Sequence, residues 1–194
     1  MRDKLEWILA SGSPRRRELL TRLNRHFRVL SASVEEWEPE RADPAEQVLE
    51  NARRKGEAVA VSHPEAFVLA ADTTVALGKR LFAKPVDRES AVSMLAALSG
   101  RDHQVLTGVA LFYGGQCHRF YESSRVFFKV LDRRCIERYI DKVNVYDKAG
   151  GYAIQDHGHL IIERYEGSFE NIMGLPVQRL LQDMVKVDWM SFSY

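Results

Sequence analysis

Hydrophobic positions along the chain fall into short runs separated by turn residues, which is typical of a compact protein with several strands and helices. Apolar or loosely alternating runs predict strands at residues 5–10, 27–34, 67–71, 152–155 and 160–165. Two hairpins are expected as well, one over 75–81 around Gly78 and one in which 105–112 and 120–130 flank Gly114 and Gly115.

Helices are predicted where apolar residues recur at helical spacing behind a capping or proline residue. The five predicted helices begin near Ser13, Asp43, Asp87, Arg133 and Pro176 and end near residues 23, 61, 98, 142 and 187. Because strands and helices alternate and hairpins are mixed in, we expect an α/β fold whose sheet is mixed rather than purely parallel.

Composition narrows the class of protein. The 194 residues are 45% hydrophobic, and no linker interrupts them, so we expect one domain over 1–194. With 28 Lys and Arg against 27 Asp and Glu, the chain lacks the basic excess of nucleic-acid or acidic-membrane binders. No apolar run approaches the ~20 residues that cross a bilayer, and the start does not resemble a signal peptide, so a cytoplasmic protein is expected. Cys117 and Cys135 suggest neither a disulfide nor a zinc site.

The segment SGSPRRR, residues 11–17, carries the strongest local signal for ligand binding. Ser11 and Ser13 place two hydroxyls around a glycine where a strand passes into a helix, and three arginines follow in the first helical turn. Cations are unfavourable there because this end of the helix dipole is positive. A bound phosphate would offset that cost, since Arg15 and Arg16 form bidentate hydrogen bonds with phosphate oxygens. The alternative is a solvated basic face, and neither a Walker loop nor a GxGxxG fingerprint is present.

The carboxylate of Asp72 is the second candidate. It directly follows the apolar run 67–71 and precedes Thr73 and Thr74, so we expect it at the carboxyl end of a buried strand. Sheet proteins with crossover connections bind ligands at such ends. A structural role is the alternative, in which Asp72 caps its own turn.

Single polar residues add to these candidates. Lys55 and Lys84 supply ammonium groups, and Lys84 precedes a proline that restricts its backbone to an extended conformation. Glu35 and Glu36 are candidate ligands of a divalent cation. The amide of Gln155 can both donate to and accept from a base edge. For the lysines and glutamates the alternative is ordinary solvent exposure.

Five stretches, taken together, identify a family. SGSPRRRELL, ADTTV, KPVDRESAVSMLAALSGRDHQVLTGVAL, DKAGGYAIQ and GSFENIMGLPV follow one another between Leu9 and about Leu181. In this order and spacing they resemble the Maf family of nucleoside triphosphate pyrophosphatases. Five co-linear motifs are far more specific than any one of them. The tail after about residue 185 lies outside the match.

The resemblance implies both a fold and an activity. The fold is an elongated, twisted mixed sheet flanked by helices, with two lobes around a cleft, related to inosine triphosphatases and assembled as a homodimer. The activity is hydrolysis of a nucleoside triphosphate to the monophosphate and pyrophosphate in the cytoplasm, with Mg²⁺ or Mn²⁺ as the divalent metal cation. Neither a nucleic acid nor a membrane is an expected partner.

The resemblance also assigns roles to residues of this sequence. Asp72 matches the proposed proton acceptor and, with Glu36, is a candidate metal ligand. Arg15, Thr73 and Gln155 match the positions that separate the branches, and they resemble the branch acting on dTTP and UTP. The branch acting on 7-methyl-GTP has SPWR and SDQ instead.

Glu36, Lys55 and Lys84 match acidic and basic pocket positions of the family. With Ser11, Ser13 and Arg16 of the SGSPRRR segment, the two lysines are the candidates for binding phosphate or substrate. One departure adjoins them. Lys55 is followed by Gly56, where the family usually has alanine, and a glycine inside a helix weakens it by about 1 kcal/mol.

Two other functions compete with hydrolysis of dTTP and UTP. A nucleotide-binding regulator of cell division would use the same pocket without turnover, because a binding site and a slow catalytic site need almost the same residues. The intact Asp72 favours turnover, since a sensor needs no acceptor for a water proton. Specificity for 7-methyl-GTP is disfavoured by Arg15, Thr73 and Gln155.

Overall fold

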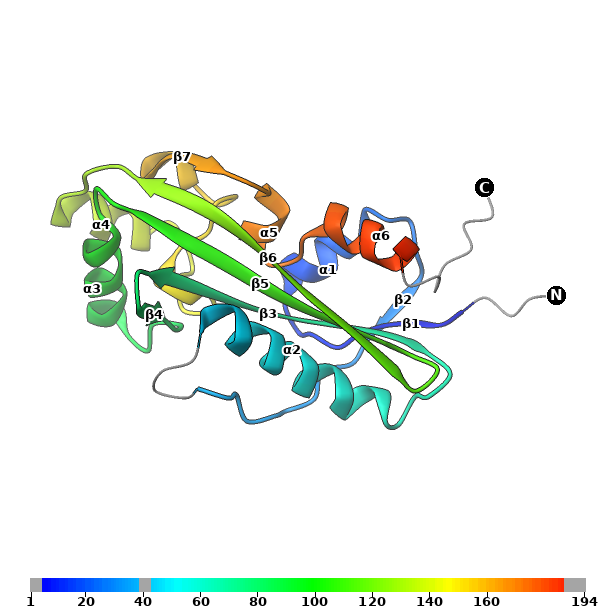
Figure 1. Cartoon of the computed structure of the whole chain (residues 1–194). Coiled ribbons are helices and arrows are strands. Elements are labelled where there is room, and N and C mark those ends of the chain that lie inside the picture. The colour runs from blue at the N-terminus through cyan, green and yellow to red at the C-terminus, as the bar shows by residue number, and fades with distance from the viewer. Residues whose placement is uncertain (1–4, 39–42, 187–194) are drawn as a thin grey trace. The chain divides into compact units, whose positions relative to one another are not determined.

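The computed structural model describes residues 5–38 and 43–186, and in that part of the chain seven strands form one mixed sheet (Figure 1). The strands are β1 (Trp7–Leu9), β2 (Phe27–Val29), β3 (Phe67–Leu77), β4 (Arg80–Phe82), β5 (Asp102–Tyr113), β6 (Gln116–Phe128) and β7 (Ile162–Glu166). Their order is β2-β1-β3-β5-β6-β7, and β4 pairs with β3. Strand β1 is parallel to β2 and β3, whereas β4 and β7 are antiparallel to their neighbours. The predicted mixed α/β sheet is confirmed.

The predicted helices are also confirmed, within one or two residues at most ends. They are α1 (Pro14–Thr21), α2 (Pro44–Ala60), α3 (Arg88–Leu98), α4 (Arg133–Ile140) and α6 (Val177–Lys186), and a short α5 (Phe169–Met173) was not predicted. Asp43 caps α2 by accepting from the Ala45 amide at 2.8 Å, and Asp87 caps α3 by accepting from the Ser90 amide at 2.7 Å. At α1 the proline begins the helix as expected, but the Ser13 side chain makes no capping hydrogen bond.

Two strand predictions are wrong, the end of the strand over residues 67–71 and the strand over residues 152–155. Asp72 does not end a strand, because β3 continues through it to Leu77, and Asp72 caps no turn. The charge is tolerated inside the strand because a lysine on α2 pairs with it. The predicted strand over 152–155 is not formed either. That segment is irregular and lies between short 3₁₀ turns at Ala149–Gly151 and Gly158–Leu160.

The chain divides into two compact units. Unit 1 comprises residues 1–72, 107–122 and 174–194, and unit 2 comprises residues 73–106 and 123–173. In unit 1 a core of small and branched side chains joins β1, β3 and α2: Ile8, Ala10, Val59, Ala66, Val68 and Ala70. In unit 2 a larger core surrounds α3 and α4, and Leu95, Leu98 and Tyr139 are fully buried in it. The prediction of one domain over 1–194 stays a prediction.

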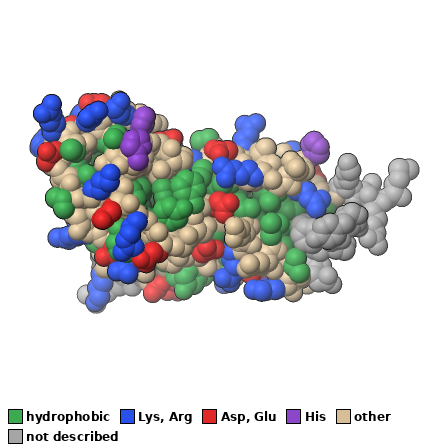
Figure 2. All heavy atoms as spheres, turned by 90° about the horizontal axis from the view of Figure 1, so that it is seen from above, with side chains coloured by type: hydrophobic (Ala, Val, Ile, Leu, Met, Phe, Trp, Pro, Cys, Tyr) green, Lys and Arg blue, Asp and Glu red, His purple; other side chains and the backbone are tan. Residues whose placement is uncertain are grey.

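Charged side chains of both signs are interspersed over the face shown in Figure 2. None of the described helices is long and apolar enough to cross a membrane. Cys117 and Cys135 are free thiols, and both are exposed.

A buried histidine in unit 2 makes stability depend on pH. His103 on β5 is 2% exposed and stacks edge-to-face on Phe128 and Tyr152, and its Nε2 lies 2.7 Å from the Tyr152 hydroxyl. Burial lowers the pKa of His103 to about 4, and the nearby Asp102 only partly opposes the shift. An unfolded histidine titrates near 6.5. Between these values the unfolded chain binds the extra proton, so stability is full above pH 6.5 and falls as the pH approaches 4.

We expect this loss to reach about 3 kcal/mol in unfolding free energy. Urea unfolding of the wild type and of His103→Gln at pH 7, 6, 5 and 4.5 measures it. The wild type should lose more stability than the variant over this range, because the carboxylates titrate in both. Parallel curves for the two proteins would show that His103 does not carry the effect.

Candidate active site

Lys55 joins two carboxylates in unit 1. Its Nζ lies 2.6 Å from Asp72 Oδ1 and 2.7 Å from Glu36 Oε1. The side chains of Lys55 and Asp72 are 20% and 12% exposed, whereas that of Glu36 is 43% exposed. The structure therefore brings together three of the predicted residues from α2, β3 and the segment after β2, with the Lys55–Asp72 pair the more shielded from water.

A buried asparagine that sequence reasoning missed supports this cluster. Asn51 is 2% exposed and stands one helical turn before Lys55 on α2. Its Oδ1 accepts from the Trp37 amide at 2.7 Å, and its Nδ2 donates to the Trp37 carbonyl at 3.3 Å. Because Trp37 directly follows Glu36, these bonds fix the backbone beside the second carboxylate. In the sequence, the signal for this role is that Asn51 is a polar residue on the apolar face of the predicted helix.

Gly56 has a packing role beyond its expected cost to the helix. A Cβ atom at this position would lie 2.4 Å from the ring of Phe112 and 3.1 Å from the Cβ of Ala70. Glycine thus allows α2 to approach β3 and β5 closely, next to the residue whose ammonium must reach Asp72. The sequence showed only the weaker helix propensity.

The segment of residues 11–17 forms a tight polar turn into α1. Ser11 is 8% exposed, and its Oγ accepts from the Ser13 amide at 3.3 Å and from Arg16 Nη1 at 3.1 Å. Arg16 Nε donates to the Gly174 carbonyl at 2.8 Å. This bond holds Arg16 to the segment before α6. The sequence predicted that Arg16 binds phosphate, but it did not predict this structural role. Arg15 is half-buried, and the first turn of α1 contains no acidic residue.

Burial and neighbouring charges in unit 1 change the pKa of Arg16. Burial lowers the pKa of Arg16 from its ordinary value, the carboxylates of Asp72 and Glu36 act against this shift, and Arg15 adds to it. A guanidinium nevertheless stays charged in proteins. The cluster has three cationic side chains, Arg15, Arg16 and Lys55, and two anionic ones, Asp72 and Glu36. The one excess positive charge favours an anionic ligand.

Thr73, Lys84 and Gln155 belong to unit 2. Lys84 is exposed on the loop after β4, and the neighbouring Ala83 carbonyl accepts from the Gly150 amide at 3.1 Å. This bond joins the lysine loop to the turn that leads toward Gln155. Gly150 has a positive φ of 71°, and a Cβ there would lie within 3.2 Å of Val75, so only glycine suits the turn. Thr73 is half-buried on β3.

Asp72 and Glu36 suit the divalent cation that the resemblance implies. Carboxylate oxygens are hard ligands, and Mg²⁺ is commonly held by one or two of them together with substrate phosphates. Both carboxylates already converge on one cation, the Lys55 ammonium. Among the residues that the structure describes, no three His, Cys, Asp or Glu side chains gather into a complete protein cage for a metal.

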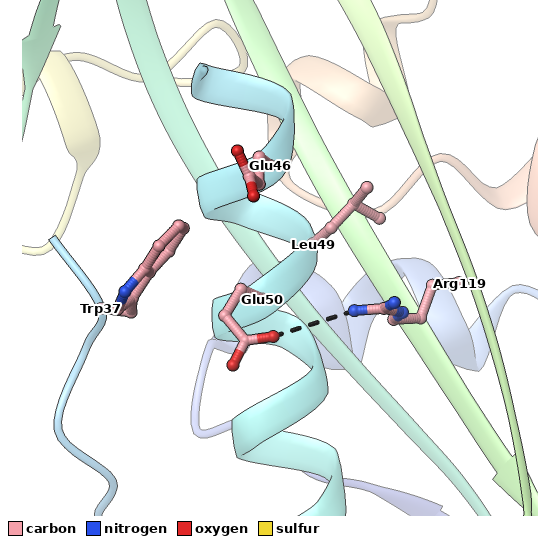
Figure 3. Close-up of a pocket in the computed structure, with 5 residues that line it drawn as sticks. All are labelled: Trp37, Glu46, Leu49, Glu50 and Arg119. Atoms are coloured by element: carbon pink, nitrogen blue, oxygen red, sulfur yellow. Dashed lines mark ion pairs between the residues drawn. The ribbon is translucent and has the colours of Figure 1, made fainter. Parts of the chain in front are cut away.

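A separate hollow of about 560 Å³ opens in unit 1 beside α2. Figure 3 shows its lining residues, Trp37, Glu46, Leu49, Glu50 and Arg119. Arg119 lies 3.8 Å from Glu50, whose pKa is lowered to about 2, chiefly by its hydrogen bond with Arg53. None of the predicted site residues lines this hollow.

The fold of this chain is shared with a solved structure. The backbone is similar to the solved structure of a HAM1 protein from Coxiella burnetii, with a TM-score of 0.55 and 16% sequence identity. The match covers 96% of this chain and 100% of that one. At this identity the likeness establishes the fold alone, an open mixed α/β sheet flanked by helices.

Sequence comparison identifies the family. The profile of the family described as Maf-like protein matches residues 6–187. Curated relatives named dTTP/UTP pyrophosphatase include one from Pelotomaculum thermopropionicum, 45% identical, covering 93% of this chain and 95% of the relative. Another, from Myxococcus xanthus, is 46% identical and covers 90% and 89%, respectively. The chain belongs to the Maf-like protein family, as its five motifs indicated.

Proposed function

We propose that this protein is a nucleoside triphosphate pyrophosphatase that prefers dTTP and UTP. The observation that carries the proposal is the Lys55 ammonium held between Asp72 and Glu36, beside the arginines of α1. Relatives at 44–46% identity that span most of the chain are named dTTP/UTP pyrophosphatase, which supports the same substrates here.

The reaction requires an anion site and a proton acceptor. Water adds to the α-phosphorus, the bond from that phosphorus to the bridging oxygen breaks, and pyrophosphate leaves with the electron pair. Ser11, Ser13, Arg15 and Arg16, in the segment that leads into α1, bind the phosphate oxygens together with Lys55 and stabilise the charge that develops on the leaving group. The family resemblance assigns Lys84 to substrate binding as well. Asp72 accepts the proton of the attacking water, and Lys55 orients its carboxylate.

A divalent metal is part of this proposal. Asp72 and Glu36 would hold Mg²⁺ or Mn²⁺, which when bound supplies Lewis-acid activation of water and neutralisation of phosphate charge. A homodimer in the cytoplasm is proposed on the family resemblance, and sedimentation of the purified protein tests the assembly.

Pyrophosphate release from UTP, dTTP, CTP, GTP and 7-methyl-GTP, with Mg²⁺ or Mn²⁺, tests the function directly. Turnover of UTP and dTTP above the other substrates is the expected result. Preference for 7-methyl-GTP would place the protein in the other branch of the family. Nucleotide binding without any turnover would favour the regulator instead.

Gln155 is proposed to recognise the base, and the family resemblance assigns Arg15 and Thr73 to substrate specificity as well. Uracil and thymine present two carbonyl acceptors and one N3–H donor, which the amide of Gln155 and backbone groups match. Loss of such a bond lowers discrimination, because a pocket built for hydrogen bonding rejects a base that leaves its groups unsatisfied.

We expect Gln155→Ala to lower the ratio of kcat/KM for UTP over CTP by about tenfold, which corresponds to one lost hydrogen bond. The kcat for UTP should fall less than this ratio. Steady-state kinetics on both nucleotides measures the two effects. An unchanged ranking of substrates would remove Gln155 from base recognition.

A further inference from the structure

The segment that carries Gln155 has no helix or strand to hold it. Residues 152–156 lie between two 3₁₀ turns, and none of them belongs to the sheet. A residue that selects one base over another must keep its position, because a displacement of about 1 Å is enough to spoil a hydrogen-bonded site. The backbone of this segment is instead held by side chains of unit 2.

Tyr139 makes the principal contacts. It lies on α4, its side chain is fully buried, and its hydroxyl accepts from the Ala153 amide at 3.0 Å. Two acceptors share the single hydrogen of this hydroxyl, the Ala153 carbonyl oxygen at 3.2 Å and the Asp156 carbonyl oxygen at 3.4 Å. One oxygen atom thus holds the backbone two residues before Gln155 and one residue after it.

Burial keeps the Tyr139 hydroxyl protonated, so that it can both donate and accept hydrogen bonds. It raises the pKa of Tyr139 to about 12, so the group stays protonated and acts as donor and acceptor at once. The neighbouring Tyr152 is fixed in a similar way, because its hydroxyl lies 2.7 Å from Nε2 of the buried His103. The contacts flank Gln155 on both sides and leave its side chain to other partners.

The amide of Gln155 has a defined polarity. Its Nε2 donates to Asp156 Oδ2 at 3.3 Å, and a carboxylate oxygen only accepts, so the nitrogen must face Asp156. The Oε1 atom is buried and has no hydrogen-bond partner among the described residues. An acceptor in this state matches the N3–H donor of uracil or thymine, whereas N3 of cytosine is itself an acceptor.

We propose that Tyr139 is a positioning residue for base selection, which holds the backbone around Gln155 so that its Oε1 accepts from N3–H of a uracil or thymine base. The inference rests on the proposed function and deepens it. Tyr139 touches no substrate and acts only through Gln155.

Nucleotide binding in a background with strongly reduced turnover tests this role. Asp72→Asn supplies the background, and titration calorimetry with Mg²⁺ gives Kd values for UTP and CTP. The variants added to it are Tyr139→Phe, Gln155→Ala and both together. We expect each single change to lower the preference for UTP over CTP by about tenfold, as for one hydrogen bond. The double change should lower it no further, because both residues act through one contact.

A matched control separates positioning from general loss of stability. Ile136→Val removes a buried methyl group from the same helix, at a side chain that is 2% exposed and makes no hydrogen bond to residues 152–156. It should leave the preference for UTP over CTP unchanged. In the active protein, Tyr139→Phe should raise KM for UTP more than it lowers kcat.

The outcomes distinguish this proposal from the proposed function. If Gln155→Ala lowers the preference and Tyr139→Phe does not, Tyr139 has no positioning role, while the proposed function stands. If the background itself shows no preference, base reading by Gln155 and positioning by Tyr139 both fail. Pyrophosphate release by the wild type then decides the proposed function on its own.

Amide hydrogen exchange of the wild type provides a second measurement that needs no variant. The Ala153 amide should exchange as slowly as the buried amides of β5, although its segment is irregular, because the Tyr139 hydroxyl protects it. Exchange at the rate of an open loop would overturn the proposal even if Tyr139→Phe failed to fold.

Discussion

Asp72→Asn is expected to lower kcat/KM for UTP and dTTP on the order of a thousandfold, within the range that removal of a general base produces. The substitution keeps the shape of the side chain but leaves a neutral amide that cannot accept the water proton. It also replaces the charged partner of the Lys55 ammonium, now 2.6 Å from Asp72 Oδ1. Pyrophosphate release measured on purified wild type and variant gives the ratio directly.

Asp183→Asn is a matched control for this experiment. Asp183 on α6 has a side chain that is 3% exposed, and it pairs with Arg179 at 3.0 Å, Lys186 at 3.1 Å and His118 at 3.3 Å. It is thus another buried carboxylate of unit 1 held by cations, but none of these residues is in the proposed site. The control should lose stability and retain turnover. If Asp72→Asn stayed within about tenfold of the wild type, Asp72 would not be the proton acceptor, since general acid–base catalysis is worth more than that.

Local sequence rules predicted most of the fold because they act over a few neighbouring residues. Asp87 and Ser90 cap α3 through bonds between residues three positions apart, and the helix they predict is the one observed. The capping pattern that starts at Asp43 similarly located the beginning of α2. The errors arose where a distant partner overrides the local rule.

Asp72 illustrates such an error. A polar residue after a buried run ends a strand when nothing compensates its charge, but here Lys55 lies 17 positions away in sequence and pairs with it. The strand therefore continues to Leu77. The residue types at the site could be recognised from the motifs, whereas the ion pair that permits Asp72 to stand inside β3 required the fold.

Asn51 and Tyr139 show why supporting residues were missed. Each resembles an ordinary helical residue in the sequence, and each hydrogen-bonds to backbone atoms 14 residues away in the chain. Backbone N–H and C=O groups carry no sequence signal, so side chains that satisfy them cannot be found from residue types alone. Both residues fix irregular segments next to proposed site residues, Glu36 and Gln155.

Gly108→Ala is expected to lower the free energy of unfolding by about 3 kcal/mol, at the upper end of overpacking costs. A Cβ at Gly108 on β5 would lie 2.4 Å from the backbone carbon and oxygen of Val48 and 2.7 Å from the Leu49 nitrogen. These atoms belong to the backbone of α2 and cannot rotate away as a side chain could. The helix must therefore shift from the sheet, and the expected fall in Tm is roughly 10 °C for a chain of this size.

Gly12→Ala is the stability control, because a Cβ there would approach no atom closer than 3.9 Å. Calorimetry should show a small change in Tm for this variant and a large one for Gly108→Ala. The same shift of α2 would withdraw Lys55 from Asp72, so Gly108→Ala should also lose activity at temperatures where it is still folded. Normal stability of Gly108→Ala would show that α2 tolerates the added methyl group and that close packing of α2 on β5 does not hold Lys55 in place.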